Sequence, residues 1–174
     1  MVFCQSQTHE SLSDVREMAF QASCDILQHF GQPMAEDTEM CAFDRAGLQP
    51  LVYTADDTLC SSLLNFVMHR CFIDVDNEDQ RLLSETQGTD DEVAAKIEIV
   101  HKRRTLLSGF AQLIIYRRIP MIYGASVFGH YIKAFSDYGD VIRLTISKCR
   151  ELSQIECAKS LAVCLTNVSK FFSC

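Results

Sequence analysis

Acidic side chains between residues 74 and 92 have the spacing of ligands in a calcium-binding loop. Four of them would occupy positions one, three, five and twelve of a twelve-residue loop: Asp74, Asp76, Glu78 and Glu85. Position six of such a loop needs a glycine for its sharp turn, and this chain has Asp79 there. The whole stretch 74–92 holds eight acids and one base, which is typical of a solvated segment. We therefore favour an acidic flexible linker over 74–92, with a calcium loop as the alternative.

Thiol and imidazole groups could bind a transition metal, but their spacing does not favour it. The nine cysteines are odd in number and include no Cys-x-x-Cys pair, and several fall on helical apolar stripes, where a thiol acts as a small buried apolar group. They are residues 4, 24, 41, 60, 71, 149, 157, 164 and 174. The five histidines show no spacing typical of metal ligands. We expect no metal site, no cofactor and no disulfide framework.

Nucleophilic and phosphate-binding patterns are also missing. The seven glycines form no phosphate-binding loop, and Ser108-Gly109 lies inside a helical pattern without a preceding strand, which excludes the serine elbow of a hydrolase. The sequence therefore predicts a protein that is not an enzyme and has no small-molecule substrate.

Basic residues gather in the C-terminal half of an acidic protein. The chain carries a net charge of −7, but residues 93–174 hold twelve bases and five acids. The run 102–104 is Lys-Arg-Arg, and successive helical residues point about 100° apart, so a solvated helix is favoured over a continuous phosphate-binding track. Four bases lie off the main apolar stripes and are expected to reach solvent and bind an acidic or polyanionic partner: Lys102, Arg103, Lys133 and Arg143.

No membrane or secretory segment is expected. The longest apolar run, 106–116, is interrupted by polar residues and is shorter than the roughly 20 residues that span a bilayer. The first residues lack a basic leader and a long apolar core, so the chain is expected to be intracellular.

Apolar residues at spacings of three and four predict an all-α fold of about six helices in antiparallel pairs, forming a single segment over 1–174. The helices are expected over about 13–30, 58–72, 92–116 and 121–135, from Asp140, and from Ser153. Residues 31–56 contain glycine and proline breakers and are expected to be irregular, with a short extended piece at 51–53.

Local signals suggest how these helices begin, end and pack. Asp56 or Asp57 is expected to cap the second helix, and Ser153 with Glu156 forms a capping box. Gly139 is expected to end a helix in a left-handed turn, after which Asp140 caps the next. The first helix carries Val15, Ala19, Ala22 and Ile26 on one face and Phe20, Cys24 and Leu27 on its other side, so it is expected to be buried over much of its circumference. The other expected buried faces are Val93, Ile97, Val100, Leu107, Phe110 and Ile114, which Arg104 interrupts; Met121, Ala125, Phe128, Ile132 and Phe135; Ile142, Ile146 and Cys149; and Leu161, Leu165, Val168 and Phe172 in the last helix.

Short segments along nearly the whole chain carry a resemblance to a known family. They are residues 47–53, 64–68, 72–74, 96–98, 101–104, 113–116, 127–128, 130–131, 133, 137–140, 147–148 and 157–159. The most specific are His-Lys-Arg-Arg at 101–104 and Asp-Tyr-Gly-Asp at 137–140. With these segments the chain resembles the stromal antigen (stromalin) family of cohesin subunits, as a partial chain or truncated paralogue. It departs from the family pattern at Arg117-Arg118, at Pro120 and at 134–136.

The resemblance implies a HEAT-repeat-like array, that is, a segment of an α-solenoid, from the later repeats of such a subunit. It also implies a non-enzymatic cohesin accessory subunit that binds the kleisin subunit, supports chromatin or DNA association and sister chromatid cohesion, and resides on chromosomes in the nucleus. Two other classes remain open: a generic helical protein-interaction scaffold outside cohesin, and a calcium-binding regulator.

Overall fold

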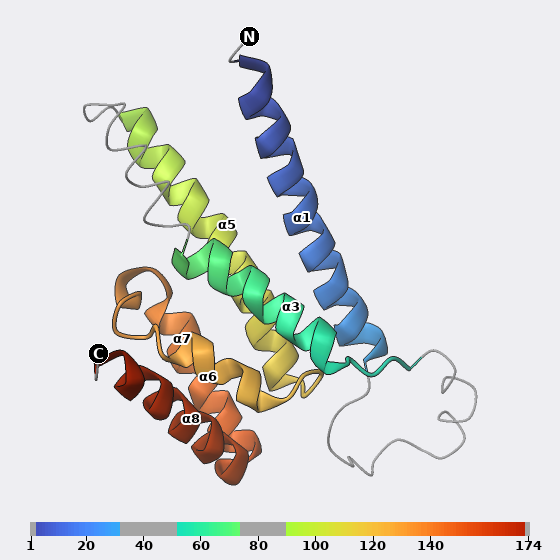
Figure 1. The fold of residues 1–174 in the computed structure, drawn as a ribbon, viewed down its shortest axis with the longest axis vertical. Coiled ribbons are helices and arrows are strands. Elements are labelled where there is room, and N and C mark those ends of the chain that lie inside the picture. The colour runs from blue at the N-terminus through green and yellow to red at the C-terminus, as the bar shows by residue number, and fades with distance from the viewer. Residues whose placement is uncertain (1–2, 32–51, 74–89, 173–174) are drawn as a thin grey trace.

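The computed structural model describes residues 3–31, 52–73 and 90–172, and this part of the chain is all-α, as predicted (Figure 1). Its six α-helices are α1 (Phe3–Phe30), α3 (Asp57–Met68), α5 (Asp90–Ile115), α6 (Gly124–Phe128), α7 (Phe135–Leu152) and α8 (Gln154–Phe172). A π-helical turn, η2 (His69–Ile73), extends α3, and a 3-10 turn, η3 (Met121–Tyr123), precedes α6. In the described residues, β pairing is limited to one isolated parallel bridge between Gly31 and Tyr53.

Helix α1 begins ten residues before the predicted start at 13 and buries only one of its two apolar faces. Phe20, Cys24 and Leu27 point into the core, whereas Val15 and Ile26 of the predicted face are more than half exposed. Both sets have helical spacing, so α1 is apolar on two sides. The neighbouring helices cover only the side with Phe20, Cys24 and Leu27. The expectation that α1 is buried over much of its circumference was therefore wrong.

Helix α3 agrees closely with the prediction for 58–72. The Leu59 amide donates to the Asp56 side chain at 2.7 Å, which confirms Asp56 as the N-cap. The helix and η2 bury one apolar side: Cys60, Leu63, Val67 and Cys71. The amide of Tyr53 donates to the Phe30 carbonyl at 2.8 Å, so an extended piece does adjoin the end of α1.

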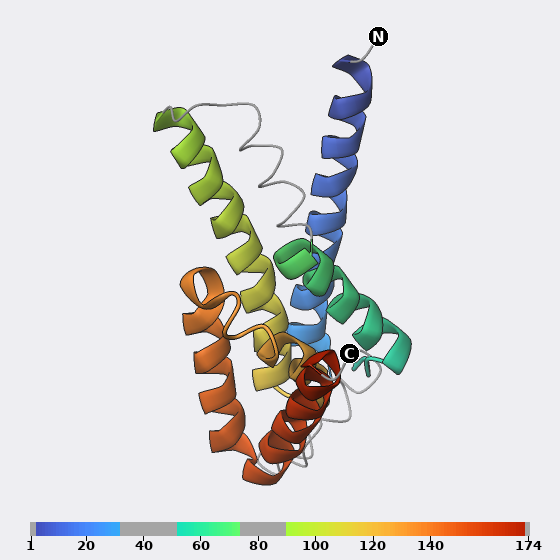
Figure 2. The ribbon, with the colours of Figure 1, turned by 60° about the vertical axis from the view of Figure 1, so that its left-hand side comes forward.

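Helix α5 packs mainly through its C-terminal half. Leu107, Phe110 and Ile114 are buried as predicted, but Val93 and Ile97 of the same predicted face are exposed. In both views the N-terminal parts of α1 and α5 project beyond the other described helices (Figures 1 and 2). Residues 90–92 lie inside α5, so the predicted linker is wrong for these three. The rest of it, with the calcium-loop positions, lies outside the described residues.

The helix predicted for 121–135 is instead divided into η3, α6 and a turn. Gly129 follows α6, and the amides of His130 and Tyr131 donate to carbonyls three residues back, as in a tight turn. Ile132 is 86% exposed, although it belonged to the predicted buried stripe. Helix α6 has five residues, begins with Gly124 and is followed by Gly129. Because glycine stabilises a helix poorly, these two residues favour the short helix.

Helix α7 includes the segment that was predicted to be a turn. Residues 137–140 are helical, Gly139 does not adopt a left-handed conformation, and the helix starts after Ala134. The predicted inward residues Ile142 and Cys149 are buried. The error arose because an Asp-Tyr-Gly-Asp string is typical of turns, whereas packing of Tyr138 and Gly139 against neighbours favours a helix here.

Helix α8 begins where predicted, but its predicted inner face is correct only in part. The Glu156 amide donates to the Ser153 hydroxyl at 3.3 Å, which confirms Ser153 as the cap. The buried residues are Cys157, Ser160 and Cys164. Leu161 and Val168 of the predicted inner face are partly buried against the core, whereas Leu165 is 69% exposed, so the prediction was wrong for Leu165.

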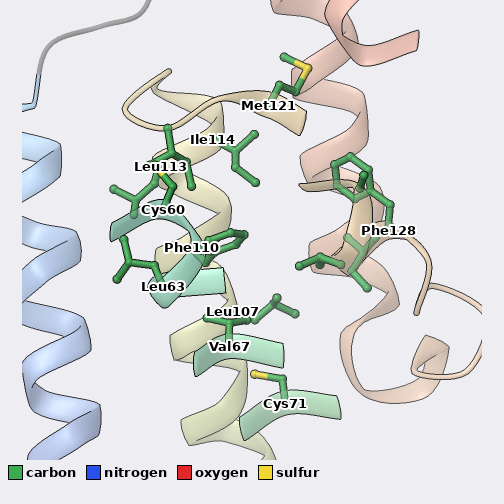
Figure 3. Packing of buried hydrophobic residues seen from close by; sticks show 14 of the residues in the cluster. Cys60, Leu63, Val67, Cys71, Leu107, Phe110, Leu113, Ile114, Met121 and Phe128 are labelled. Atoms are coloured by element: carbon green, nitrogen blue, oxygen red, sulfur yellow. The ribbon is translucent and has the colours of Figure 1, made fainter. Parts of the chain in front are cut away.

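The core is built around α5, and buried residues of α1, α3, α6, α7 and α8 also belong to it. Figure 3 shows Cys60, Leu63, Val67 and Cys71 packed against α5, with Met121 and Phe128 on its other side. Six cysteines with described side chains are free, and all six are buried, as the apolar-stripe interpretation predicted: Cys24, Cys60, Cys71, Cys149, Cys157 and Cys164. No helix among the described residues has the length and apolar character needed to cross a bilayer.

Candidate partner interface

Three of the four bases predicted to bind a partner reach solvent. Lys102 lies on α5 and pairs with Glu98 one turn away at 3.4 Å. Lys133 lies in the turn before α7, and Arg143 is exposed on α7. Lys102 is about 200° around α5 from Arg104, which bonds α7, so Lys102 points away from α7. Partner binding by these three bases stays a prediction.

Arg103, the fourth predicted base, is buried, with 4% of its surface exposed. Its carbonyl accepts a hydrogen bond from the Cys71 thiol at 3.4 Å, and its guanidinium lies beside the Tyr138 hydroxyl. Burial, and then the nearby Cys71 thiol, raise the pKa of Tyr138 to about 12, although the Arg103 cation opposes the rise. The expectation that Arg103 binds a partner was therefore wrong, because α7 and η2 cover the side of α5 from which it projects.

Arg104 joins α5 to α7. Its Nη1 donates to Asp140 Oδ1 at 3.0 Å and also to the Asp137 carbonyl, and its Nη2 bonds the second Asp140 oxygen. This bidentate pair raises the pKa of Arg104 and lowers the pKa of Asp140, mainly through the shared hydrogen bonds. The sequence interpretation had noted Arg104 as a break in the apolar face of α5. The matching acids at 137 and 140 were the signal that could have revealed the pair.

Aromatic contacts tie η2 and the turn at 129–134 to the same junction. The Phe72 ring stacks on His130 with centroids 4.5 Å apart and meets Tyr138 edge-on at 5.7 Å. Burial lowers the pKa of His130, and the nearby Lys133 cation lowers it further. Residues 72–73, 101–104, 130–131 and 137–140 thus meet at one internal junction. Their shared role in this structure is to hold four elements together.

A cleft of about 420 Å³ lies between the end of α5, η3 and the start of α8. Its η3 side is apolar and includes Pro120 and the partly exposed Ile122, while α8 contributes Glu156 and Lys159. Arg117 borders the cleft at the end of α5. Sequence reasoning noted Arg117 only as a departure from a family pattern and did not predict the cleft, because α8 is distant in the sequence from α5.

No cluster of three or more histidine, cysteine or acidic side chains in the described ranges could hold a metal ion. The buried thiols are not activated either. Burial raises the pKa of Cys71 to about 12 even though Arg103 and Arg70 act in the opposite direction. What the described residues offer is a set of surfaces: exposed bases, exposed apolar side chains and one cleft.

The sequence of the chain is similar to the sequences of named proteins. No family model matches the chain. The chain is 39% identical over 165 residues, 95% of its length, to "Cohesin subunit SA-1" of Xenopus laevis. It is 32% identical over 162 residues to "Cohesin subunit SA-3" of Mus musculus, and 31% identical over 140 residues to "Cohesin subunit scc-3" of Caenorhabditis elegans. It spans 12%, 12% and 11% of the length of these relatives, respectively.

Proposed function

We propose, from the premise that this chain belongs to the stromal antigen family of cohesin subunits, that it works as a segment of a non-enzymatic cohesin accessory subunit. In this proposal the helices form part of a HEAT-repeat-like solenoid that binds the kleisin subunit of the cohesin ring. The segment thereby supports chromatin association and sister chromatid cohesion in the nucleus.

The observation that carries the proposal is the 39% identity to "Cohesin subunit SA-1" over 95% of this chain. Similarity over so much of the chain includes the internal junction as well as the surface. The junction of Arg103, Arg104, Tyr138 and Asp140 uses the two segments that most specifically carry the family resemblance. The identity therefore supports the same helix packing, and with it the same class of function.

Exposed apolar surface supports a role in an extended array or a protein complex. On α1, Val15, Met18 and Ile26 recur at spacings of three and eight, and they are 56%, 64% and 54% exposed. On α8, Ile155 and Leu165 are 70% and 69% exposed. Stacked helical repeats cover such faces with their neighbours or with partners.

The charge pattern favours an acidic protein segment or DNA as the contact of the C-terminal half. Four arginines in residues 93–174 bond to other elements of the chain: Arg103, Arg104, Arg117 and Arg118. Lys102, Lys133 and Arg143 are among the bases that remain on the surface. The basic surface is therefore smaller than the sequence suggests, and its contribution is mainly to association rate and salt dependence.

Co-precipitation from nuclear extract tests the proposal. The tagged 174-residue chain is expected to capture a cohesin kleisin subunit, and nuclease treatment beforehand should leave the capture unchanged, since the proposed contact is between proteins. An Arg103→Glu variant, which should be unable to form the α5–α7 junction, serves as the unfolded control. Capture of other proteins without any kleisin would favour the alternative, a helical interaction scaffold outside cohesin.

A further inference from the structure

The cleft beside Arg117 has the composition of a peptide-docking site. Its volume of about 420 Å³ is within the range of roughly 300–1,000 Å³ that is usual for ligand pockets. One wall is apolar, through Pro120 and Ile122, and the opposite wall on α8 is polar, through Glu156 and Lys159. Ile122 is 42% exposed, so the cleft opens to solvent along an apolar edge. An open cleft of this kind suits a short chain segment better than an enclosed small molecule.

The backbone of Arg117 has a conformation that glycine usually supplies. Its φ is 54°, the only positive value for a non-glycine residue among those described. The amide of Arg117 donates to the Ile114 carbonyl at 3.1 Å and the amide of Arg118 to the Leu113 carbonyl at 2.8 Å, which is the Schellman ending of a helix. Glycine would fit this place with less strain. An arginine here therefore suggests that its side chain has a use.

The side chain of Arg117 keeps a donor for which the described residues supply no acceptor. One Nη2 bond, of 3.0 Å, goes to the Leu152 carbonyl at the end of α7 and fixes the guanidinium beside the cleft. The Nε atom is buried and has no hydrogen-bond partner among the described residues. The guanidinium keeps its positive charge at the edge of the cleft, where a carboxylate, with two acceptor oxygens, would pair with it.

The charges around the cleft agree with an anionic ligand group. Lys159 projects from α8 and makes no ion pair within the described part of the chain. Glu156 lies one turn away and is the only acid that lines the cleft among the described residues. Arg117 and Lys159 together outweigh the charge of Glu156, so the cleft has a net positive charge that attracts a carboxylate. Glu156 repels the same carboxylate and weakens this attraction.

We propose that this cleft binds an apolar peptide segment that carries one carboxylate, with Arg117 and Lys159 receiving the acid and η3 receiving the flanking aliphatic side chains. Arg117 is then the residue that selects acid over amide in the docked segment. The inference deepens the proposed function, and it rests on that function only in taking the segment to belong to a partner subunit.

An amide-resolved titration of the full 174-residue chain tests the cleft directly. The probes are acetyl-Ala-Leu-Glu-Leu-Ala-amide and the same peptide with Gln in place of Glu, each followed by ¹H–¹⁵N NMR shifts at millimolar concentration. We expect shifts at 119–122 and 156–160, with the Glu peptide bound about tenfold more tightly than the Gln peptide, as a charge-assisted bond would give.

Two variants separate selection from folding. Arg117→Gly removes the guanidinium but keeps the left-handed backbone, so the chain should stay folded while the preference for Glu over Gln disappears. Glu156→Gln should instead strengthen binding of the Glu peptide. Equal affinities for the two peptides, shifts that map elsewhere, or the absence of shifts would overturn the proposal. If the chain captures kleisin but does not bind the Glu peptide, only the peptide-binding role of the cleft is refuted. If it binds the Glu peptide but does not capture kleisin, only the kleisin contact is refuted.

Discussion

Arg104 on α5 and Asp140 on α7 form a two-pronged ion pair across 36 positions of the chain. The same guanidinium bonds the backbone carbonyl of Asp137 at the start of α7. Next to it, Arg103 lies buried against Tyr138. Two of the three bases in the run 102–104 therefore serve the packing of the helices, and Lys102 alone of the three is fully on the surface.

Replacing Arg104 and Asp140 singly and together by Ala should reveal a modest coupling between them. The Asp140 side chain is 67% exposed, so solvent screens the charges, and the expected coupling is about 0.5–1 kcal/mol in the free energy of unfolding. A double-mutant cycle by urea denaturation measures it. The surface pair Lys148–Glu151 is a matched control and should couple more weakly. Coupling in that control equal to the Arg104–Asp140 value would show that α5 and α7 are not joined as described.

Arg103→Met should destabilise the protein far more than Lys102→Met. The first change leaves the buried Tyr138 hydroxyl without its charged neighbour, at an expected cost of about 1–3 kcal/mol. The second alters an exposed residue of the same helix and should cost less than about 0.5 kcal/mol. Thermal unfolding of both variants checks this. Equal melting temperatures would mean that Arg103 reaches solvent after all.

The sequence predicted helices well and their buried faces less well, for identifiable reasons. Asp56 and Ser153 cap helices as expected because capping is a local interaction between residues three positions apart. Both apolar sides of α1 were expected to be buried, but only the side of Phe20 is, and Ile26 on the other side is exposed. Arg103 was mispredicted for the same reason, since position relative to an apolar stripe says nothing about what a distant helix such as α7 covers.

Gly139→Ala tests whether residues 137–140 form a helix or a turn. In the observed helix, alanine at position 139 would stabilise the fold by up to about 1 kcal/mol relative to glycine, because its helix propensity is higher. A Cβ at 139 would lie 2.8 Å from the Phe135 ring, but that ring is 62% exposed and can rotate away. The variant should therefore be as stable as the original or slightly more so in urea denaturation. A left-handed turn would instead make the alanine variant less stable by about 1 kcal/mol.

Stability should fall on mild acidification, in part because of His130. Burial, and then Lys133, lower its pKa in the folded state, so the unfolded chain binds the proton more readily. Neutral His130 makes its full contribution to the free energy of unfolding above the pKa of the unfolded state, about 6.5. This contribution is lost as the pH falls through the lower pKa of the folded state. His130→Phe keeps an aromatic ring on Phe72 and should flatten the change in unfolding free energy between neutral and mildly acidic pH. An identical pH profile in the two proteins would contradict this account.

The exposed bases should contribute to partner binding through charge. A triple reversal, Lys102→Glu with Lys133→Glu and Arg143→Glu, leaves out the buried Arg103 and should preserve helicity in circular dichroism. Its affinity for kleisin or DNA should fall, and the dependence of affinity on salt should become flatter. Lys170→Glu, a single reversal near the end of α8, is the control and should have a smaller effect. Unchanged affinity for both partners in the folded triple variant would leave apolar packing as the source of binding.

The most direct test of the central claim is a fluorescence anisotropy titration of a labelled, purified cohesin kleisin subunit with the purified 174-residue chain. Membership in the stromal antigen family predicts saturable binding that weakens as salt is raised, and that is lost in the Arg103→Glu variant when the α5–α7 junction fails to form. A folded chain that leaves the anisotropy of the kleisin unchanged at low salt would contradict the proposed function.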